Sequence, residues 1–150
     1  MIYPKKEEVK KLIKNNNYKR VPISYEIYSD SQTPIEVMRR LKKISNHCYM
    51  LESIEDKDKW GRYTFLGFDP LLEFTCQDGE VNIKGDFSSY KHSDLNKSDI
   101  FTTTTNNPRK YIKQIIEENK TPRLKDLPPF TGGLVGYFAY DYIKYSEPSL

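Results

Sequence analysis

The side chains that most often carry metal or nucleophilic chemistry are few in this sequence and poorly grouped. There are two cysteines, Cys48 and Cys76, and two histidines, His47 and His92. Without a Cys-x-x-Cys pair no zinc site is expected, and the cysteines are interpreted as buried, reduced thiols. Neither histidine has a partner at catalytic spacing, so both are interpreted as structural or exposed. No metal site and no catalytic residue is predicted in this chain.

Three glycines near the end of the sequence raise the question of a phosphate-binding loop. Gly132, Gly133 and Gly136 do not follow the G-x-G-x-x-G spacing, and no helix is predicted after them against which an anion could sit. We interpret them as strand glycines that another backbone or an aromatic ring approaches closely. The run from 134 to 140 is almost continuously apolar and predicts a buried strand.

Composition narrows the class of protein. The 150 residues suffice for one domain. Lysine and arginine number 24 against 21 acidic residues, and the two signs alternate, which indicates a solvated surface and not a nucleic-acid footprint. No apolar run approaches the roughly 20 residues of a membrane span, and the first residues lack the apolar region of a secretory signal. A cytoplasmic protein that binds neither nucleic acid nor membrane is expected.

Helices and strands are both predicted, with the strands mostly consecutive. Apolar residues at helical spacing predict helices over 5–15, from an N-cap at Thr33 to about residue 45, and after an N-cap at Asn107. Asp78-Gly79 between apolar runs predicts a hairpin, and the polar residues 88–105 predict a long loop. Strands are predicted over 21–29, 47–54, 62–68, 71–75, 81–84 and 134–140. The fold class is therefore α+β, a mostly antiparallel sheet with interspersed helices.

The end of the chain suggests that it is part of a longer protein. One of its most apolar stretches runs from 134 to 145, and only five residues follow Tyr145. Those five residues, SEPSL, are typical of a connector. We therefore expect a further region beyond residue 150.

Four stretches, taken together, resemble one enzyme family. They are YEIYSDSQTPIEVMRRL at 25–41, CYMLESIE at 48–55, WGRYTFLGFDP at 60–70 and PFTGGLVGYFAYDYIKY at 129–145. In this order and spacing they resemble the N-terminal region of component I of anthranilate synthase. The combination of L-E-S, G-R-Y-x-F-x-G and G-G-x-V-G-Y-x-x-Y-D carries the resemblance, and any one motif alone would be weak.

The resemblance implies a chorismate-utilising lyase of tryptophan biosynthesis. The full-length enzyme converts chorismate and ammonia to anthranilate and pyruvate with magnesium, a glutamine amidotransferase subunit (component II) supplies the ammonia, and L-tryptophan inhibits by feedback. The family's catalytic and magnesium-binding residues lie in a C-terminal region that has no counterpart here. The chain alone is therefore expected to be inactive, with Mg²⁺ bound outside it.

The resemblance also assigns an effector site to Leu51, Glu52 and Ser53. Glu52 can accept a charge-assisted hydrogen bond from the ammonium of tryptophan, Ser53 can bond near its α-carbon, and Leu51 can contact the indole. In a regular strand, however, Glu52 and Ser53 point to opposite faces, so both meet one ligand only where the strand ends or bulges. If the flanking strands pair, Arg62 lies near Ser53 and can hold the carboxylate. Alternatively, Glu52 and Arg62 are ordinary surface residues.

Two rival functions stay open from the sequence. The N-terminal part of aminodeoxychorismate synthase component I, an enzyme of the folate pathway, shares the fold and the motifs. A stand-alone tryptophan-sensing module without catalysis would require a self-contained fold. If the chain is truncated, the apolar run at 134–140 is left uncovered, and the isolated chain is expected to self-associate.

Overall fold

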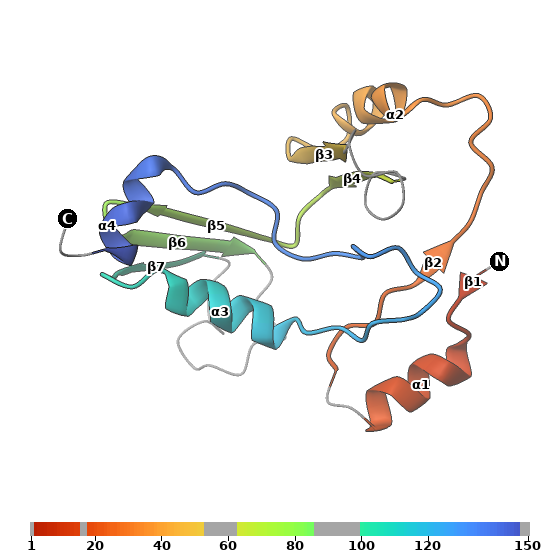
Figure 1. The fold of residues 1–150 in the computed structure, drawn as a ribbon, viewed down its shortest axis with the longest axis horizontal. Helices are drawn as coiled ribbons and strands as arrows, with labels where there is room; N and C mark the ends of the chain where they lie inside the picture. Colours follow the sequence, from red (N-terminus) through yellow and green to blue (C-terminus); the bar gives the residue numbers. More distant parts are fainter. Residues whose placement is uncertain (1, 16–17, 53–62, 86–99, 148–150) are drawn as a thin grey trace. The chain divides into compact units, whose positions relative to one another are not determined.

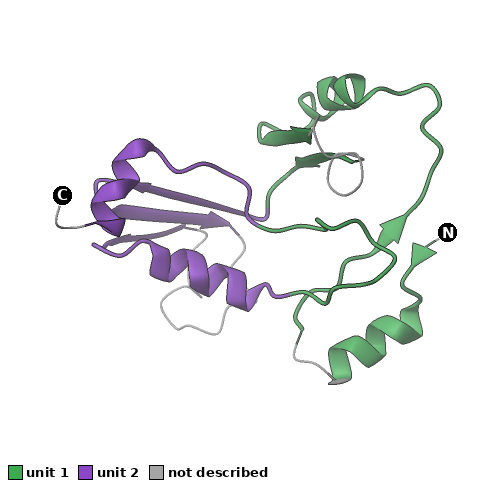
Figure 2. Ribbon diagram, viewed as in Figure 1, with its two compact units in different colours: residues 1–70, 121–133 green, residues 71–120, 134–150 purple. Residues whose placement is uncertain are grey.

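The computed structural model describes residues 2–15, 18–52, 63–85 and 100–147. They belong to two compact units, one made of residues 1–70 and 121–133 and the other of residues 71–120 and 134–150 (Figure 2). Every strand pairing among the described residues is antiparallel, and helices lie between the strands along the chain (Figure 1). The predicted α+β class is confirmed. No helix within the described ranges is long and apolar enough to cross a membrane.

The first unit begins with a two-residue strand and a helix. Strand β1 (Ile2–Tyr3) pairs with β2 (Ser24–Tyr25), and helix α1 (Lys6–Asn15) lies between them along the chain. The helix is confirmed, with acidic residues in its first turn and Lys14 in its last, as the helix dipole favours. The strand predicted over 21–29 is too long, because β2 has only two residues. Its partner β1 is also two residues long and can pair with no more than two residues of this segment.

Helix α2 (Pro34–Leu41) starts where the sequence predicts. The Thr33 hydroxyl accepts a hydrogen bond from the backbone N–H of Glu36 at 3.3 Å, and the Glu36 carboxylate accepts one from the N–H of Thr33 at 3.2 Å. This reciprocal capping box, with Pro34 at the first position, fixes the start of the helix. The helix ends at Leu41 and not near residue 45, and a turn occupies 42–44.

A hairpin completes the first unit. Strand β3 (Cys48–Glu52) pairs with β4 (Thr64–Phe68) over five consecutive residues, so the predicted pairing is confirmed. Ser45 ties the start of β3 to the end of β4. Its hydroxyl group donates a hydrogen bond to the carbonyl of His47 at 2.9 Å and accepts one from the N–H of Asp69 at 3.1 Å.

The second unit is built on a three-stranded sheet in the order β5-β6-β7. Strands β5 (Leu72–Gln77) and β6 (Glu80–Gly85) form the predicted hairpin, and both turn residues, Asp78 and Gly79, have the positive φ that such a turn requires. Strand β7 (Ile100–Thr104) pairs with β6. The loop predicted over 88–105 is therefore wrong at its end, because the threonines suit a strand edge as well as a loop. Residues 88–99 lie outside the described residues.

Helix α3 (Arg109–Glu118) packs on one face of this sheet and makes the core of the second unit. Val81, Ile83 and Ile115 are its buried hydrophobic residues. Alternation along β6 sends Val81 and Ile83 to the helix side and the polar Glu80, Asn82 and Lys84 to the other side. The N-cap is Pro108 and not Asn107 as predicted, and no side chain caps the helix.

The apolar run at 134–140 is not the buried strand that its composition predicts. Within the described residues it has no strand pairing, and Tyr137 and Tyr140 are 91% and 87% exposed. A 3₁₀ turn, η1 (Tyr140–Tyr142), and the short helix α4 (Ile143–Ser146) follow. The nearby glycines are not strand glycines as predicted, and a Cβ at Gly132 or Gly136 would meet no atom within 4 Å. At Gly133 the predicted aromatic neighbour is present, since a Cβ there would lie 3.5 Å from the ring of Phe130.

Candidate functional site

The structure places two of the four predicted effector residues at the end of β3. Leu51 and Glu52 are the last two residues of that strand, paired with Phe65 and Thr64 of β4. Both side chains are exposed, Leu51 by 44%. Ser53 and Arg62 lie outside the described residues, so their approach to each other stays a prediction.

Strand geometry separates Leu51 from Glu52. The register runs without interruption from the first pair of the hairpin to the pair of Glu52 with Thr64. Successive side chains of a regular strand point to opposite faces, so Leu51 shares a face with Tyr49, and Glu52 lies on the other. A ligand on the Leu51 face therefore meets Glu52 only if the chain changes direction directly after β3.

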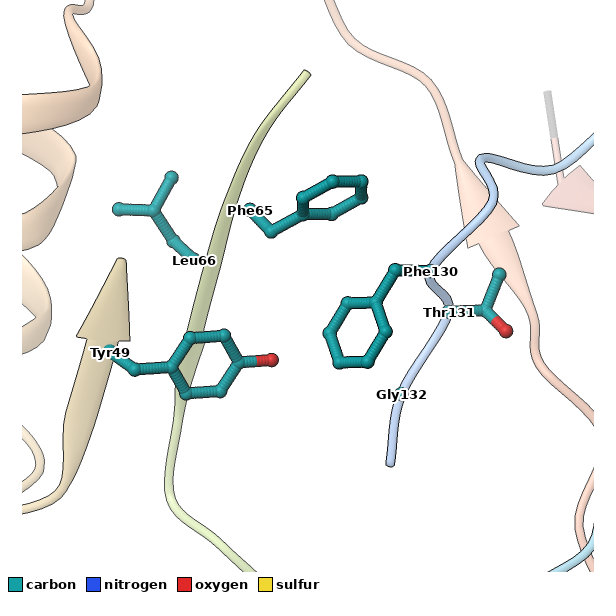
Figure 3. Close-up of a pocket in the computed structure, with 6 residues that line it drawn as sticks. All are labelled: Tyr49, Phe65, Leu66, Phe130, Thr131 and Gly132. Carbon is teal, nitrogen blue, oxygen red and sulfur yellow. The ribbon is translucent and has the colours of Figure 1, made fainter. Parts of the chain in front are cut away.

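The Leu51 face of the hairpin carries a pocket. It has a volume of about 210 Å³ and is lined by residues of β3, β4 and the segment 130–132 of the same unit. Figure 3 shows Tyr49 and Phe65 pointing toward Phe130, while Leu66 points the other way. The Phe65 and Phe130 rings meet edge to face, with centroids 5.5 Å apart and planes at 86°, an arrangement that aromatic quadrupoles favour.

Tyr49 reaches the pocket because the residue opposite it has no side chain. Tyr49 pairs with Gly67, and a Cβ at Gly67 would lie 2.7 Å from the tyrosine hydroxyl oxygen and closer still to two ring carbons. Since real Cβ atoms do not approach so closely, any side chain at position 67 would push the ring away. Gly67 thus sets where Tyr49 lies.

The pocket combines aromatic walls with one hydroxyl. Burial raises the pKa of the Tyr49 hydroxyl, so it stays protonated over the whole physiological range and can both donate and accept a hydrogen bond. A cavity of roughly 150 Å³ already admits a benzene ring. The pocket is therefore large enough for one aromatic ring with a polar atom at its edge.

Sequence reasoning missed Tyr49, Phe65 and Phe130 as site residues. A signal was present, because Tyr49 is two residues before Leu51 and shares its face in any regular strand. Phe130 had no such signal, because it comes from a segment far along the chain without regular structure. Among the described residues, no group of three acidic, histidine or cysteine side chains comes together as metal ligands.

Sequence comparisons relate this chain to a family of synthases. Anthranilate synthase component 1 of Acetivibrio thermocellus is 35% identical over 147 residues, which cover 98% of this chain and 27% of that protein. The component 1 proteins of Acinetobacter calcoaceticus and Aquifex aeolicus are each 34% identical, over 92% and 95% of this chain and 26% of each protein. No protein-family model and no solved structure matches the chain.

The resemblance indicated by the motifs is confirmed, since the chain is similar to anthranilate synthase component 1 proteins over nearly its whole length. The chain spans about a quarter of the length of these relatives.

Proposed function

We propose that this chain is the N-terminal regulatory and scaffolding part of an anthranilate synthase component I. The full-length protein would convert chorismate and ammonia to anthranilate and pyruvate. The observation that carries the proposal is the coverage, since the match takes in 98% of this chain but only 27% of the first relative. The three relatives named above are anthranilate synthase component 1 proteins, which favours this enzyme over aminodeoxychorismate synthase component I.

The regulatory part of the proposal concerns L-tryptophan. Leu51 and the aromatic pocket beside it offer the apolar surface that an indole ring needs, and both lie on one face of the β3–β4 hairpin. Glu52, Ser53 and Arg62 would supply the polar contacts to the ammonium and carboxylate. Because Leu51 and Glu52 point to opposite faces of β3, both would meet one ligand only where the chain changes direction directly after the strand. The rest of the full-length protein would complete the site.

Substitution of Ser53 in the full-length enzyme tests this site. Ser53→Phe places a bulky ring next to the end of β3, and we expect it to weaken inhibition by tryptophan while the uninhibited kcat and KM for chorismate stay unchanged. Ser29→Phe is the matched control, because Ser29 is an exposed serine of the same unit that lies outside the β3–β4 hairpin. Superimposable inhibition curves for wild type and Ser53→Phe would remove Ser53 from the effector site.

Calorimetry on the isolated chain separates the regulatory fragment from a stand-alone sensor. Titration with L-tryptophan should give weak or no heat of binding, because the site is incomplete, and addition of chorismate and ammonia should yield no anthranilate. Binding with a micromolar dissociation constant would instead favour a self-contained tryptophan-sensing module.

The remaining parts of the proposal follow from the component 1 family. Component II, a glutamine amidotransferase, is the expected partner, and magnesium would be held by residues outside this chain. The two free cysteines, both half-buried, fit the reducing conditions of the cytoplasm. Two experiments would test the partner and the location. The full-length protein should copurify with its amidotransferase from a cytosolic extract, and the pair should show glutamine-dependent activity.

A further inference from the structure

The lining of the aromatic pocket on the β3–β4 hairpin carries no charged side chain. All of its lining residues belong to the first unit, and they are Tyr49, Phe65, Leu66, Phe130, Thr131 and Gly132. Moving a charge out of water without a partner costs much free energy. The ammonium or carboxylate of a ligand therefore stays outside this pocket, and an uncharged ring is the part that enters.

The hydroxyl of Tyr49 is the polar side-chain group that this pocket offers to a ligand. Figure 3 shows it directed toward Phe130, whereas the Thr131 side chain points away from the three rings. The Tyr49 hydroxyl forms no hydrogen bond with another described residue, although burial is sufficient to raise its pKa. Polar groups that are withdrawn from water are nearly always hydrogen-bonded in folded proteins. This hydroxyl is therefore available to a group on the ligand.

The hydroxyl and the ring walls are held in place before any ligand arrives. Tyr49 lies over Gly67 at distances that a Cβ at position 67 would prevent. The rings of Phe65 and Phe130 support each other through their edge-to-face contact at 5.5 Å. Groups that are preorganised in this way discriminate well between ligands, because little free energy is spent on arranging them.

Volume and hydrogen bonding select among uncharged rings. A cavity of roughly 150 Å³ admits benzene, and this pocket has about 210 Å³, which leaves room for the second ring of a bicyclic group. The indole N–H is a donor only, so it needs an acceptor such as a tyrosine hydroxyl. A ring of the same size without this N–H would leave the hydroxyl of Tyr49 unpaired and bind less tightly.

We propose that Tyr49 is a specificity-determining residue of the effector site, whose hydroxyl accepts a hydrogen bond from the ring N–H of an indole bound in the aromatic pocket. This inference rests on the proposed effector role and deepens it. The pocket recognises the ring, while the polar residues at the end of β3 recognise the ammonium and carboxylate. The site thereby distinguishes tryptophan from phenylalanine, whose ring is smaller and has no donor.

NMR titration of the full chain with free indole and with benzothiophene tests Tyr49 directly. Benzothiophene has the same fused rings with sulfur in place of the N–H. We expect indole to shift the amide signals of Phe65, Gly67 and Gly132 and to bind weakly, but roughly two- to tenfold more tightly than benzothiophene. Tyr49→Phe should abolish this difference. Tyr28→Phe is the matched control, because Tyr28 is a tyrosine of the same unit that is 97% exposed.

Benzothiophene also reports whether the pocket is intact, since Tyr49→Phe should leave its binding unchanged. Equal binding of indole and benzothiophene by the wild type would overturn the proposal. A preference for indole that survives in Tyr49→Phe would overturn it as well. So would the absence of shifts at the three amides up to the solubility limit of indole.

Inhibition of the full-length enzyme separates this inference from the effector role on which it rests. Both are supported if L-tryptophan inhibits more strongly than its benzothiophene analogue, 3-benzothienyl-L-alanine, and Tyr49→Phe makes the two inhibitors equal. Equal inhibition of the wild type by the two compounds would overturn the role of Tyr49 and keep tryptophan as the effector. No inhibition by tryptophan, together with Tyr49-dependent binding of indole to the chain, would overturn the effector role and support the indole pocket.

Discussion

Replacing Gly67 with alanine tests how Tyr49 is held in the aromatic pocket. The new Cβ would lie 2.7 Å from the tyrosine hydroxyl oxygen, whereas carbon and its neighbours pack at about 3.5–4.0 Å. The end of a tyrosine side chain is free to swing, so the ring will leave the pocket and the backbone will stay. Gly67→Ala should therefore act on stability mainly through Tyr49.

Two opposing terms set the size of the effect. Alanine is about 0.5–1 kcal/mol better than glycine inside a strand. Full burial of a large side chain contributes about 1.5–3 kcal/mol, and since Tyr49 is half-buried, roughly 1–1.5 kcal/mol is lost when its ring is displaced. Gly67→Ala should lower the free energy of unfolding by about 0.5 kcal/mol. In a Tyr49→Ala background the same substitution should raise it by about 0.5–1 kcal/mol.

Urea unfolding, followed by far-ultraviolet circular dichroism, measures the free energy of unfolding of the wild type, both single variants and the double variant. The effect of Gly67→Ala on this free energy should change sign when Tyr49 is replaced with alanine. The coupling energy should be about 1–1.5 kcal/mol. Gly136→Ala is the control, because a Cβ there meets no atom within 4 Å, and it should not couple to Tyr49. Additivity of Gly67→Ala and Tyr49→Ala within about 0.3–0.5 kcal/mol would refute the reasoning.

Three further predictions concern stability. Ile83→Ala should cost about 2–5 kcal/mol in urea unfolding because Ile83 is fully buried, whereas Ile116→Ala, on the exposed side of α3, should cost under about 1 kcal/mol. Thr33→Ala should cost about 1 kcal/mol through loss of the capping box, and Thr33→Ser should restore most of it. Burial raises the pKa of Tyr49 in the folded state above its unfolded-state pKa of about 10. The neutral hydroxyl therefore contributes stability below pH ~10, and this contribution is lost as the pH rises through the folded-state pKa. Stability should therefore fall less steeply above pH ~10 in Tyr49→Phe than in the wild type, and equal slopes would contradict this.

Local patterns in the sequence predicted those parts of the fold that local interactions determine. The capping box at Thr33 needs only residues 33–36, and the turn at Asp78 and Gly79 needs only a positive φ at two positions. The pairing of β3 with β4 followed from two nearby runs of strand-forming residues. Each of these elements finds its partner within a few residues or in the next element along the chain.

The parts that could not be predicted depend on distant partners. Strand β7 forms because its backbone pairs with the edge of β6. The threonines of β7 alone do not distinguish a strand from a loop. The run at 134–140 is apolar enough for a buried strand, but a strand also needs a neighbour for its backbone hydrogen bonds. Phe130 joins the candidate site through tertiary structure only. The composition of a segment indicates that it needs a packing or pairing partner, but it does not identify that partner.

The uncovered apolar residues bear on the proposed scaffolding role. Among the described residues only Val81, Ile83 and Ile115 are buried hydrophobic residues, while Tyr137 and Phe138 are 91% and 65% exposed. Exposed apolar surface of this kind either meets another polypeptide or drives association. Sedimentation of the isolated chain should therefore show dimers or larger species that Tyr137→Ser combined with Phe138→Ser reduces. A clean monomer at high concentration would show that this surface needs no cover, and the scaffolding role would lose its physical basis.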